Sequence, residues 1–89
     1  MLRIKKDMVL QETSLQSFVV PVGKMAEEFH GMLRLNKTGV LYWRALEKGA
    51  SKEELVRLAL ETFDDIDEKK AAGDVEEFLD SIRPYLEEI

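Results

Sequence analysis

Residues 31–51 read GMLRLNKTGVLYWRALEKGAS and mark the change from a strand pattern to a helix pattern. The first five residues alternate two leucines with other side chains, which is typical of a short strand. Leu33 and Leu35 are then on the face that points to the core. Met32 and Arg34 are on the opposite face. The segment therefore predicts a short strand that leads directly into a helix.

The helix is predicted to begin after Asn36, because asparagine is favoured at the N-cap. Trp43 and Leu46 belong to an apolar stripe at helical spacing, and Gly49 supplies a C-terminal stop. The expected helix is Lys37–Lys48, with Trp43 as a packing residue of the core.

Gly39 lies inside the first turn of this predicted helix, where a glycine costs about 1 kcal/mol relative to alanine. Such a position indicates that another group approaches the backbone closely. We expect close packing on the sheet rather than contact with a ligand.

A second helix begins at Ser51, which forms a predicted capping box with Glu54. This helix should end near Phe63. Its apolar stripe is wide enough that we expect other elements to cover both flanks. The stripe consists of Leu55, Val56, Leu58, Ala59, Leu60 and Phe63.

A third helix begins either near Asp67 or at Asp74, where Asp74 and Glu77 would form another capping box. Pro84 should end or bend it one or two residues earlier, because proline lacks the amide and crowds the preceding turn. The apolar residues of this helix are Ala71, Val75, Phe78, Leu79, Ile82 and Leu86.

The front of the chain is expected to form strands. Residues 7–12 and 16–22 are rich in β-favouring types and predict a hairpin. Pro21 must lie at an edge, a bulge or the end of its strand. Residues 24–30 should form a loop or one helical turn. We therefore predict an α+β fold, in which a three-stranded antiparallel sheet is followed by three helices.

The composition limits the classes of protein that the chain can belong to. Its 89 residues allow one domain, residues 1–89, and the longest apolar run, residues 18–22, is far too short to span a bilayer. The absence of cysteine is compatible with a reducing cytoplasm, where we expect the protein. Residues 36–89 hold 8 basic and 14 acidic side chains, so this part should repel nucleic acid.

No pattern of catalytic or metal-binding residues stands out. The single histidine, His30, is interpreted as a loop residue without a nucleophile beside it. Residues 64–68 only superficially resemble a calcium loop, because the central glycine and the terminal glutamate are missing. The glycines form no phosphate-binding motif. We expect no enzyme activity, no metal and no cofactor.

Several motifs in one order resemble the PqqD family over about residues 8–82. The matching residues are Phe18-Val19-Val20-Pro21-Val22-Gly23, Leu35-Asn36-Lys37-Thr38-Gly39, Trp43, Leu46, Ser51, Glu54-Leu55 and Asp74-Val75-Glu76-Glu77-Phe78-Leu79. The chain departs from the family at residues 83–86, where Arg83-Pro84-Tyr85-Leu86 replaces the usual glycine-containing tail.

The resemblance implies a winged helix-turn-helix-like domain that recognises peptides and catalyses nothing. In such domains the leader of a ribosomally made precursor peptide adds as a strand to the edge of the third strand and packs against the third helix. The domain then presents the peptide to a modifying enzyme. In PqqD itself this partner is a radical S-adenosylmethionine enzyme of pyrroloquinoline quinone biosynthesis.

The physical properties of the sequence allow this mechanism. An edge strand at residues 31–36 offers free amides and carbonyls to an extended peptide. Part of the apolar stripe of the third helix could line a groove for the peptide. The alternative is that the whole stripe belongs to the core. Arg34, Lys37 and Arg83 could attract an acidic leader. The candidate peptide-binding residues are Met32, Leu33, Arg34, Leu35, Lys37, Val75, Phe78, Leu79, Ile82 and Arg83.

Two other classes of function remain open. The helix–turn–helix around residues 49–51 is also typical of a DNA-binding winged helix, although residues 67–89 hold eight acidic and three basic side chains. An exposed edge strand could also pair with a second copy and form a structural homodimer.

Overall fold

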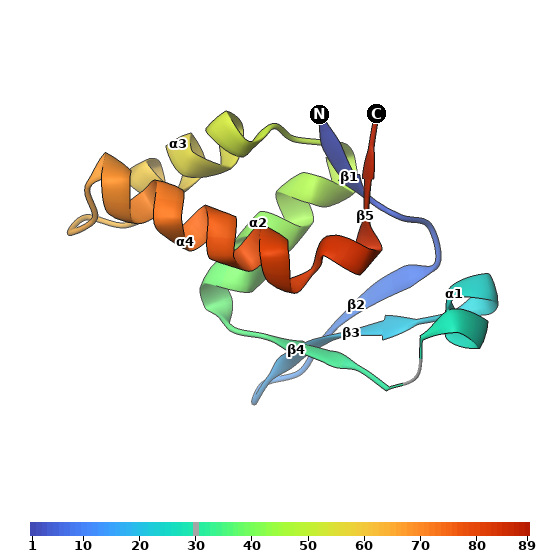
Figure 1. Ribbon diagram of the computed structural model, residues 1–89. Helices are drawn as coiled ribbons and strands as arrows, with labels where there is room; N and C mark the ends of the chain where they lie inside the picture. The colour runs from blue at the N-terminus through green and yellow to red at the C-terminus, as the bar shows by residue number, and fades with distance from the viewer. Residues whose placement is uncertain (30) are drawn as a thin grey trace.

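A computed structural model describes residues 1–29 and 31–89, so the interpretation of His30 lies outside the described residues. Three helices lie above a three-stranded sheet (Figure 1). The elements are β1 (Leu2–Ile4), β2 (Met8–Glu12), β3 (Ser17–Pro21), α1 (Gly23–Glu28), β4 (Leu33–Leu35), α2 (Lys37–Lys48), α3 (Lys52–Thr62), α4 (Glu68–Ser81), the 3-10 turn η1 (Arg83–Tyr85) and β5 (Leu86–Glu88).

The three-stranded sheet has the antiparallel order β2-β3-β4, which confirms the predicted hairpin and third strand. Val19 on the central strand pairs with Leu10 on one side and Leu33 on the other, and it is completely buried. Pro21 is the last residue of β3, where its missing amide disturbs no further pairing. Since side chains alternate along a strand, the row of Leu10, Val19 and Leu33 identifies the face of the sheet that packs on the core.

The helix boundaries follow from local hydrogen bonds. Asn36 Oδ1 accepts a bond from the Gly39 amide at 2.8 Å, and α2 has the predicted bounds. Ser51 and Glu54 form the expected capping box of α3. Asp67 caps α4 by accepting from the Lys70 amide, so the alternative start at Asp74 is wrong. The last helix is therefore almost two turns longer than a helix that began at Asp74.

The strands at the two ends of the chain were not predicted. β1 and β5 pair with each other in a separate two-stranded sheet, and the Ile89 amide donates to the Met1 carbonyl at 2.9 Å. Figure 1 places both termini side by side. Beyond α4, η1 redirects the chain toward β1, and the proline in this turn fits its first residues.

The core contains Trp43, Tyr42, Leu46, Leu55, Val75 and Ile82, which are almost or completely buried. The role of Trp43 in packing is therefore confirmed. The expectation that both flanks of α3 are covered is wrong, because Leu60 remains 38% exposed. Within the described ranges, no helix is long and apolar enough to cross a membrane.

Candidate functional site

The last strand of the three-stranded sheet has one open edge. β4 pairs with β3 on one side, and no other described strand pairs with it on the second side. Arg34 and Met32 are exposed here, and Met32 retains 64% of its accessible surface. An edge of this kind presents main-chain groups to which an extended chain can hydrogen-bond.

A trough begins where β4 ends and runs between α2 and α4. It consists of two adjoining hollows of about 320 and 500 Å³ that share Thr38, Asp74 and Glu77. We call it the α2–α4 trough. The remaining lining residues are Asn36, Gly39, Tyr42, Phe78 and Ser81 in the smaller hollow, and Phe63, Ile66, Lys70 and Gly73 in the larger one.

Gly39 determines how closely the two walls of the trough approach each other. A Cβ atom at this position would lie 3.2 Å from Cε1 of Phe78 and 3.4 Å from Cβ of Leu35. The close neighbour predicted from the sequence was the sheet, but α4 makes an equally close approach through Phe78. The absence of a side chain at Gly39 therefore lets the aromatic ring sit against the first turn of α2.

Tyr42 connects the floor of the trough to its rim. Its hydroxyl donates a hydrogen bond to Asp74 Oδ2 at 3.0 Å, and its ring lies 5.3 Å from that of Phe78. Burial raises the pKa of Tyr42 strongly, and the hydrogen bond and the charge of Asp74 raise it further. Tyr42 thus stays protonated and holds one oxygen of Asp74 in place.

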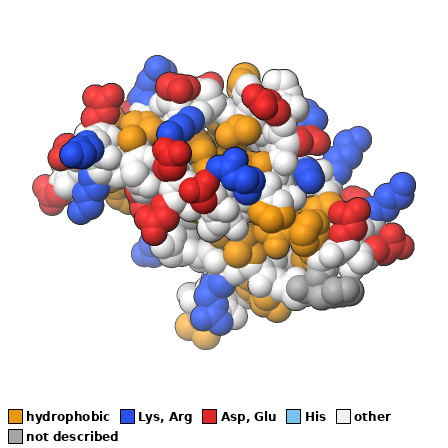
Figure 2. Space-filling view, viewed as in Figure 1, with side chains coloured by type: hydrophobic (Ala, Val, Ile, Leu, Met, Phe, Trp, Pro, Cys, Tyr) orange, Lys and Arg blue, Asp and Glu red, His pale blue; other side chains and the backbone are white. Residues whose placement is uncertain are grey.

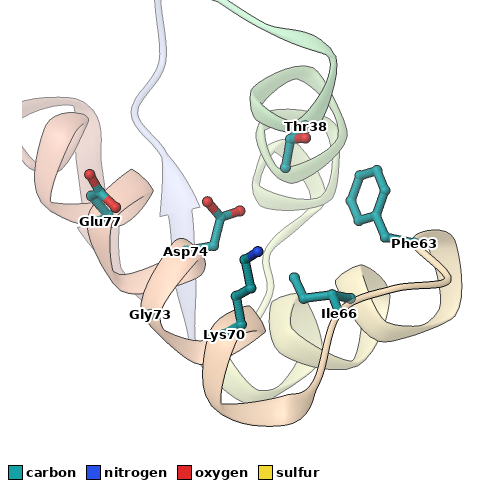
Figure 3. A pocket seen from close by; sticks show the side chains of 7 residues that line it. All are labelled: Thr38, Phe63, Ile66, Lys70, Gly73, Asp74 and Glu77. Carbon is teal, nitrogen blue, oxygen red and sulfur yellow. The ribbon is translucent and has the colours of Figure 1, made fainter.

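The larger hollow has a charged wall and an apolar wall. Figure 3 shows Lys70 and Asp74 pointing from α4 into the space, while Phe63 and Ile66 border it from the end of α3 and the loop that follows. Thr38 reaches the same space from α2. A chain that left the edge of β4 along the trough would meet polar groups first and an apolar surface afterwards.

The predicted site residues separate into a buried and an accessible group. Leu35, Val75, Leu79 and Ile82 are at most 7% exposed, so they belong to the core and support the site from beneath. Phe78 is only partly buried and lines the trough. Leu33 and Tyr85 are also partly buried. Figure 2 shows hydrophobic side chains gathered below the C-terminal end of α4 and above the sheet.

Two of the three predicted basic groups lie beside this site. Arg34 is on β4, and Lys37 is the first residue of α2. Arg83 is placed elsewhere: its guanidinium pairs with Asp80, and it lines a hollow bordered by β1 and β5. The expected cluster of three basic groups is therefore wrong for Arg83, because η1 turns it away from the trough.

The polar lining of the trough was not predicted from the sequence. Asp74 and Glu77 were identified as a helix start and as part of the family motif, not as site residues, and Tyr42 was not singled out. The need for close packing at Gly39 was the one available signal, since it pointed to an element that crosses α2 at this turn. Nowhere in residues 1–29 and 31–89 does a group of three or more His, Cys, Asp or Glu side chains have the arrangement of a metal site.

Residues 16–84 match the protein family described as coenzyme PQQ synthesis protein D, PqqD. The chain belongs to the PqqD family. The match covers β3, β4 and the helices α1 to α4, and therefore both walls of the trough in this PqqD-family chain. None of the curated proteins compared matches the sequence.

Two solved structures share the fold of this PqqD-family chain. TbiB1 in complex with the TbiA(beta) leader peptide superposes with a TM-score of 0.76 at 19% identity, covering 98% of this chain and 96% of that one. Lasso peptide synthetase B1 complexed with the leader peptide gives a TM-score of 0.73 at 14% identity, with coverage of 93% and 91%. At these identities the similarity concerns the fold.

Proposed function

We propose that this protein binds the leader of a ribosomally made precursor peptide and presents it to a modifying enzyme. The observation that carries the proposal is the open edge of β4 at the mouth of the α2–α4 trough. Membership of the PqqD family and the leader peptides held by the two structures of similar fold support it.

The proposed binding mode combines main-chain and side-chain recognition. The leader adds as a strand to β4, so that its backbone supplies affinity. Side chains on one face of the added strand contact Leu33 and Phe78, and those on the other contact Met32 and Arg34. Lys37 lies at the end of this edge and favours an acidic residue of the peptide. Leu35, Val75, Leu79 and Ile82 hold the walls in place.

The protein itself carries out no reaction in this proposal. Its partner is a radical S-adenosylmethionine enzyme or another peptide-modifying enzyme, and binding takes place in the cytoplasm, where precursor peptides are made. A homodimer that paired through β4 would occupy the same edge, so the leader and a second copy would compete for it.

Titration of the isotope-labelled protein with the precursor peptide encoded beside its gene tests the proposal. We expect amide shifts concentrated in residues 32–39 and 74–81, and loss of at least about tenfold in affinity for Phe78→Ala, because burial of a phenylalanine side chain contributes about 1.5–3 kcal/mol. Leu15→Ala is the control, since Leu15 is 94% exposed in the hairpin turn and does not line the trough. Shifts caused by duplex DNA but not by the peptide would refute the proposal.

A further inference from the structure

A hollow of about 310 Å³ lies at the start of β4, at the end of the sheet where Figure 1 places α1. Every described side chain that borders it is apolar. The bordering residues are Val20, Pro21, Ala26, Phe29, Gly31 and Met32. We call it the α1–β4 hollow. The α2–α4 trough begins at the other end of the same strand, so the open edge of β4 runs from an apolar hollow to the polar mouth of the trough.

The hollow is on the face of the sheet that points away from the helices. Val19 and Leu33 pair across β3 and β4 and face the core. Their neighbours Val20 and Met32 therefore face outward, because side chains alternate along a strand. The exposed fractions agree, since Met32 keeps 64% of its accessible surface and Val19 keeps none. The outward row along the edge of β4 is thus Met32 followed by Arg34.

The wall that α1 contributes is held in place by contacts outside the hollow. Met25 is only 8% exposed and fixes this short helix on the domain. The ring of Phe29, directly after α1, packs edge-on against that of Tyr85 in η1, with the ring centroids 5.1 Å apart. Tyr85 lies one residue beyond the range that matches the family. The hollow is therefore formed before any peptide binds, and part of its support lies outside the family motif.

The register of an added strand selects the occupant of the hollow. A strand that pairs with β4 lies about 4.8 Å from it, and its side chains alternate between the same two faces. Its outward residue beside Met32 is then next to the hollow, within the distance at which cross-strand side chains touch. Two positions along, the next outward side chain lies beside Arg34. The lining favours an apolar group at the first position, and the cation favours a carboxylate at the second.

We propose that the α1–β4 hollow binds one large apolar side chain of the leader, with an acidic residue two positions away beside Arg34. This inference rests on the proposed function and adds to it the residue pattern that the outward face of β4 selects. From Met32 to Asn36, where the trough begins, the chain advances four residues, or about 13 Å. About five extended leader residues therefore reach from the hollow to the mouth of the trough.

Alanine substitution along the leader encoded beside the gene tests this pattern with the wild-type protein. We expect one large apolar position at which alanine lowers the affinity at least about tenfold, because its burial in the hollow is lost. At an acidic position two residues away we expect a loss of about two- to fivefold, because Arg34 is exposed. Nuclear Overhauser contacts from the methyl groups of Ala26 and Met32 to the apolar side chain should place it in the hollow directly.

A variant that fills the hollow tests the same contact from the protein side. Ala26→Phe changes an exposed residue of α1 without changing the charge. It should lower the affinity for the leader at least about tenfold, and alanine at the apolar leader position should then cost nothing further. Val9→Phe is the matched control, because Val9 is exposed on the same face of the sheet but does not line the hollow. It should bind the leader like the wild type.

The outcomes separate this inference from the proposed function. Absence of leader binding by the wild type would refute the proposed function itself. Three results would overturn the hollow as a binding site and leave strand addition to β4 intact: equal affinity of wild type and Ala26→Phe, equal losses in Ala26→Phe and Val9→Phe, or no contact of the leader with the methyl groups of Ala26 and Met32. The methyl contacts decide the question even where Ala26→Phe does not fold.

Discussion

The hydroxyl of Tyr42 donates a 3.0 Å hydrogen bond to the Asp74 carboxylate and so ties α2 to α4 across the trough. Tyr42→Phe should lower the free energy of unfolding by about 0.5–1.5 kcal/mol at neutral pH, since it removes one hydrogen bond to a charged acceptor that water partly replaces. Urea denaturation of both proteins measures this difference. A double-mutant cycle with Asp74→Ala in which the two losses simply add would contradict this explanation.

The burial of Tyr42, together with the same bond, makes stability depend on alkaline pH. The raised pKa of Tyr42 means that the unfolded chain releases this proton near pH 10 while the folded chain keeps it. Its contribution is complete below that pH and is lost as the pH rises further. Unfolding midpoints between about pH 8 and 11 should therefore fall more steeply for the wild type than for Tyr42→Phe. Equal slopes of the unfolding midpoint against pH for the two proteins would refute the link between Tyr42 and stability at alkaline pH.

The glycines of α2 and α4 should respond to alanine in opposite ways. Gly73→Ala should stabilise the protein by about 0.4–1 kcal/mol, because nothing lies within 4 Å of the new Cβ and alanine favours the helix. Gly39→Ala gains the same propensity but pushes against Phe78 at 3.2 Å. It should show no gain in stability, and its affinity for the leader should fall. Thermal unfolding and peptide titration measure the two effects.

Removing the α3 cap should destabilise the domain without touching the site. Ser51→Ala loses the bond from the Glu54 amide and should cost about 1 kcal/mol, a shift of roughly 4–8 °C in Tm for a chain of this size. Ser14→Ala, in the exposed hairpin turn, should leave the Tm unchanged. Equal shifts for the two variants would show that the capping box contributes nothing.

Substitution of a core residue of α4 should mainly reduce stability, whereas substitution of a trough residue should mainly reduce leader binding. Leu79→Ala should cost about 2–5 kcal/mol of unfolding free energy, because Leu79 is 6% exposed and leaves a cavity. Where the protein remains folded, its affinity for the leader should stay close to that of the wild type. Phe78→Ala should lose affinity with a smaller loss of stability. Calorimetry of the same samples measures both the unfolding free energy and the affinity for the leader. Loss of affinity in Leu79→Ala but not in Phe78→Ala would show that the leader contacts Leu79 instead.

Local signals were enough to predict the hairpin, α2 and the start of α3. Each of these is set by neighbours in sequence: the cap at Asn36, the capping box at Ser51 and the alternation around Leu33. The start of α4 was ambiguous because Asp67 and Asp74 are both good caps. The packing of Ala71 in the core decides between them, and no local pattern carries that information.

Other features depend on contacts between distant residues. β1 and β5 have three residues each and pair across more than eighty positions, so neither carries a recognisable pattern by itself. The polar residues of the trough were missed for a related reason. Asp74 and Glu77 lie on a flank of α4 that resembles any solvated helix face, and only the approach of α2 turns that flank into a wall.

The pairing of β1 with β5 makes the fold suitable for circular permutation. With Ile89 hydrogen-bonded to Met1, a short glycine-rich linker would join the old termini, and new ones could be opened at the turn around Ser14. Such a rearranged chain would keep β4, α2 and α4 in their original order. The new chain ends would then lie at the hairpin turn, next to the end of β4, and the linker would close the β1–β5 end of the domain.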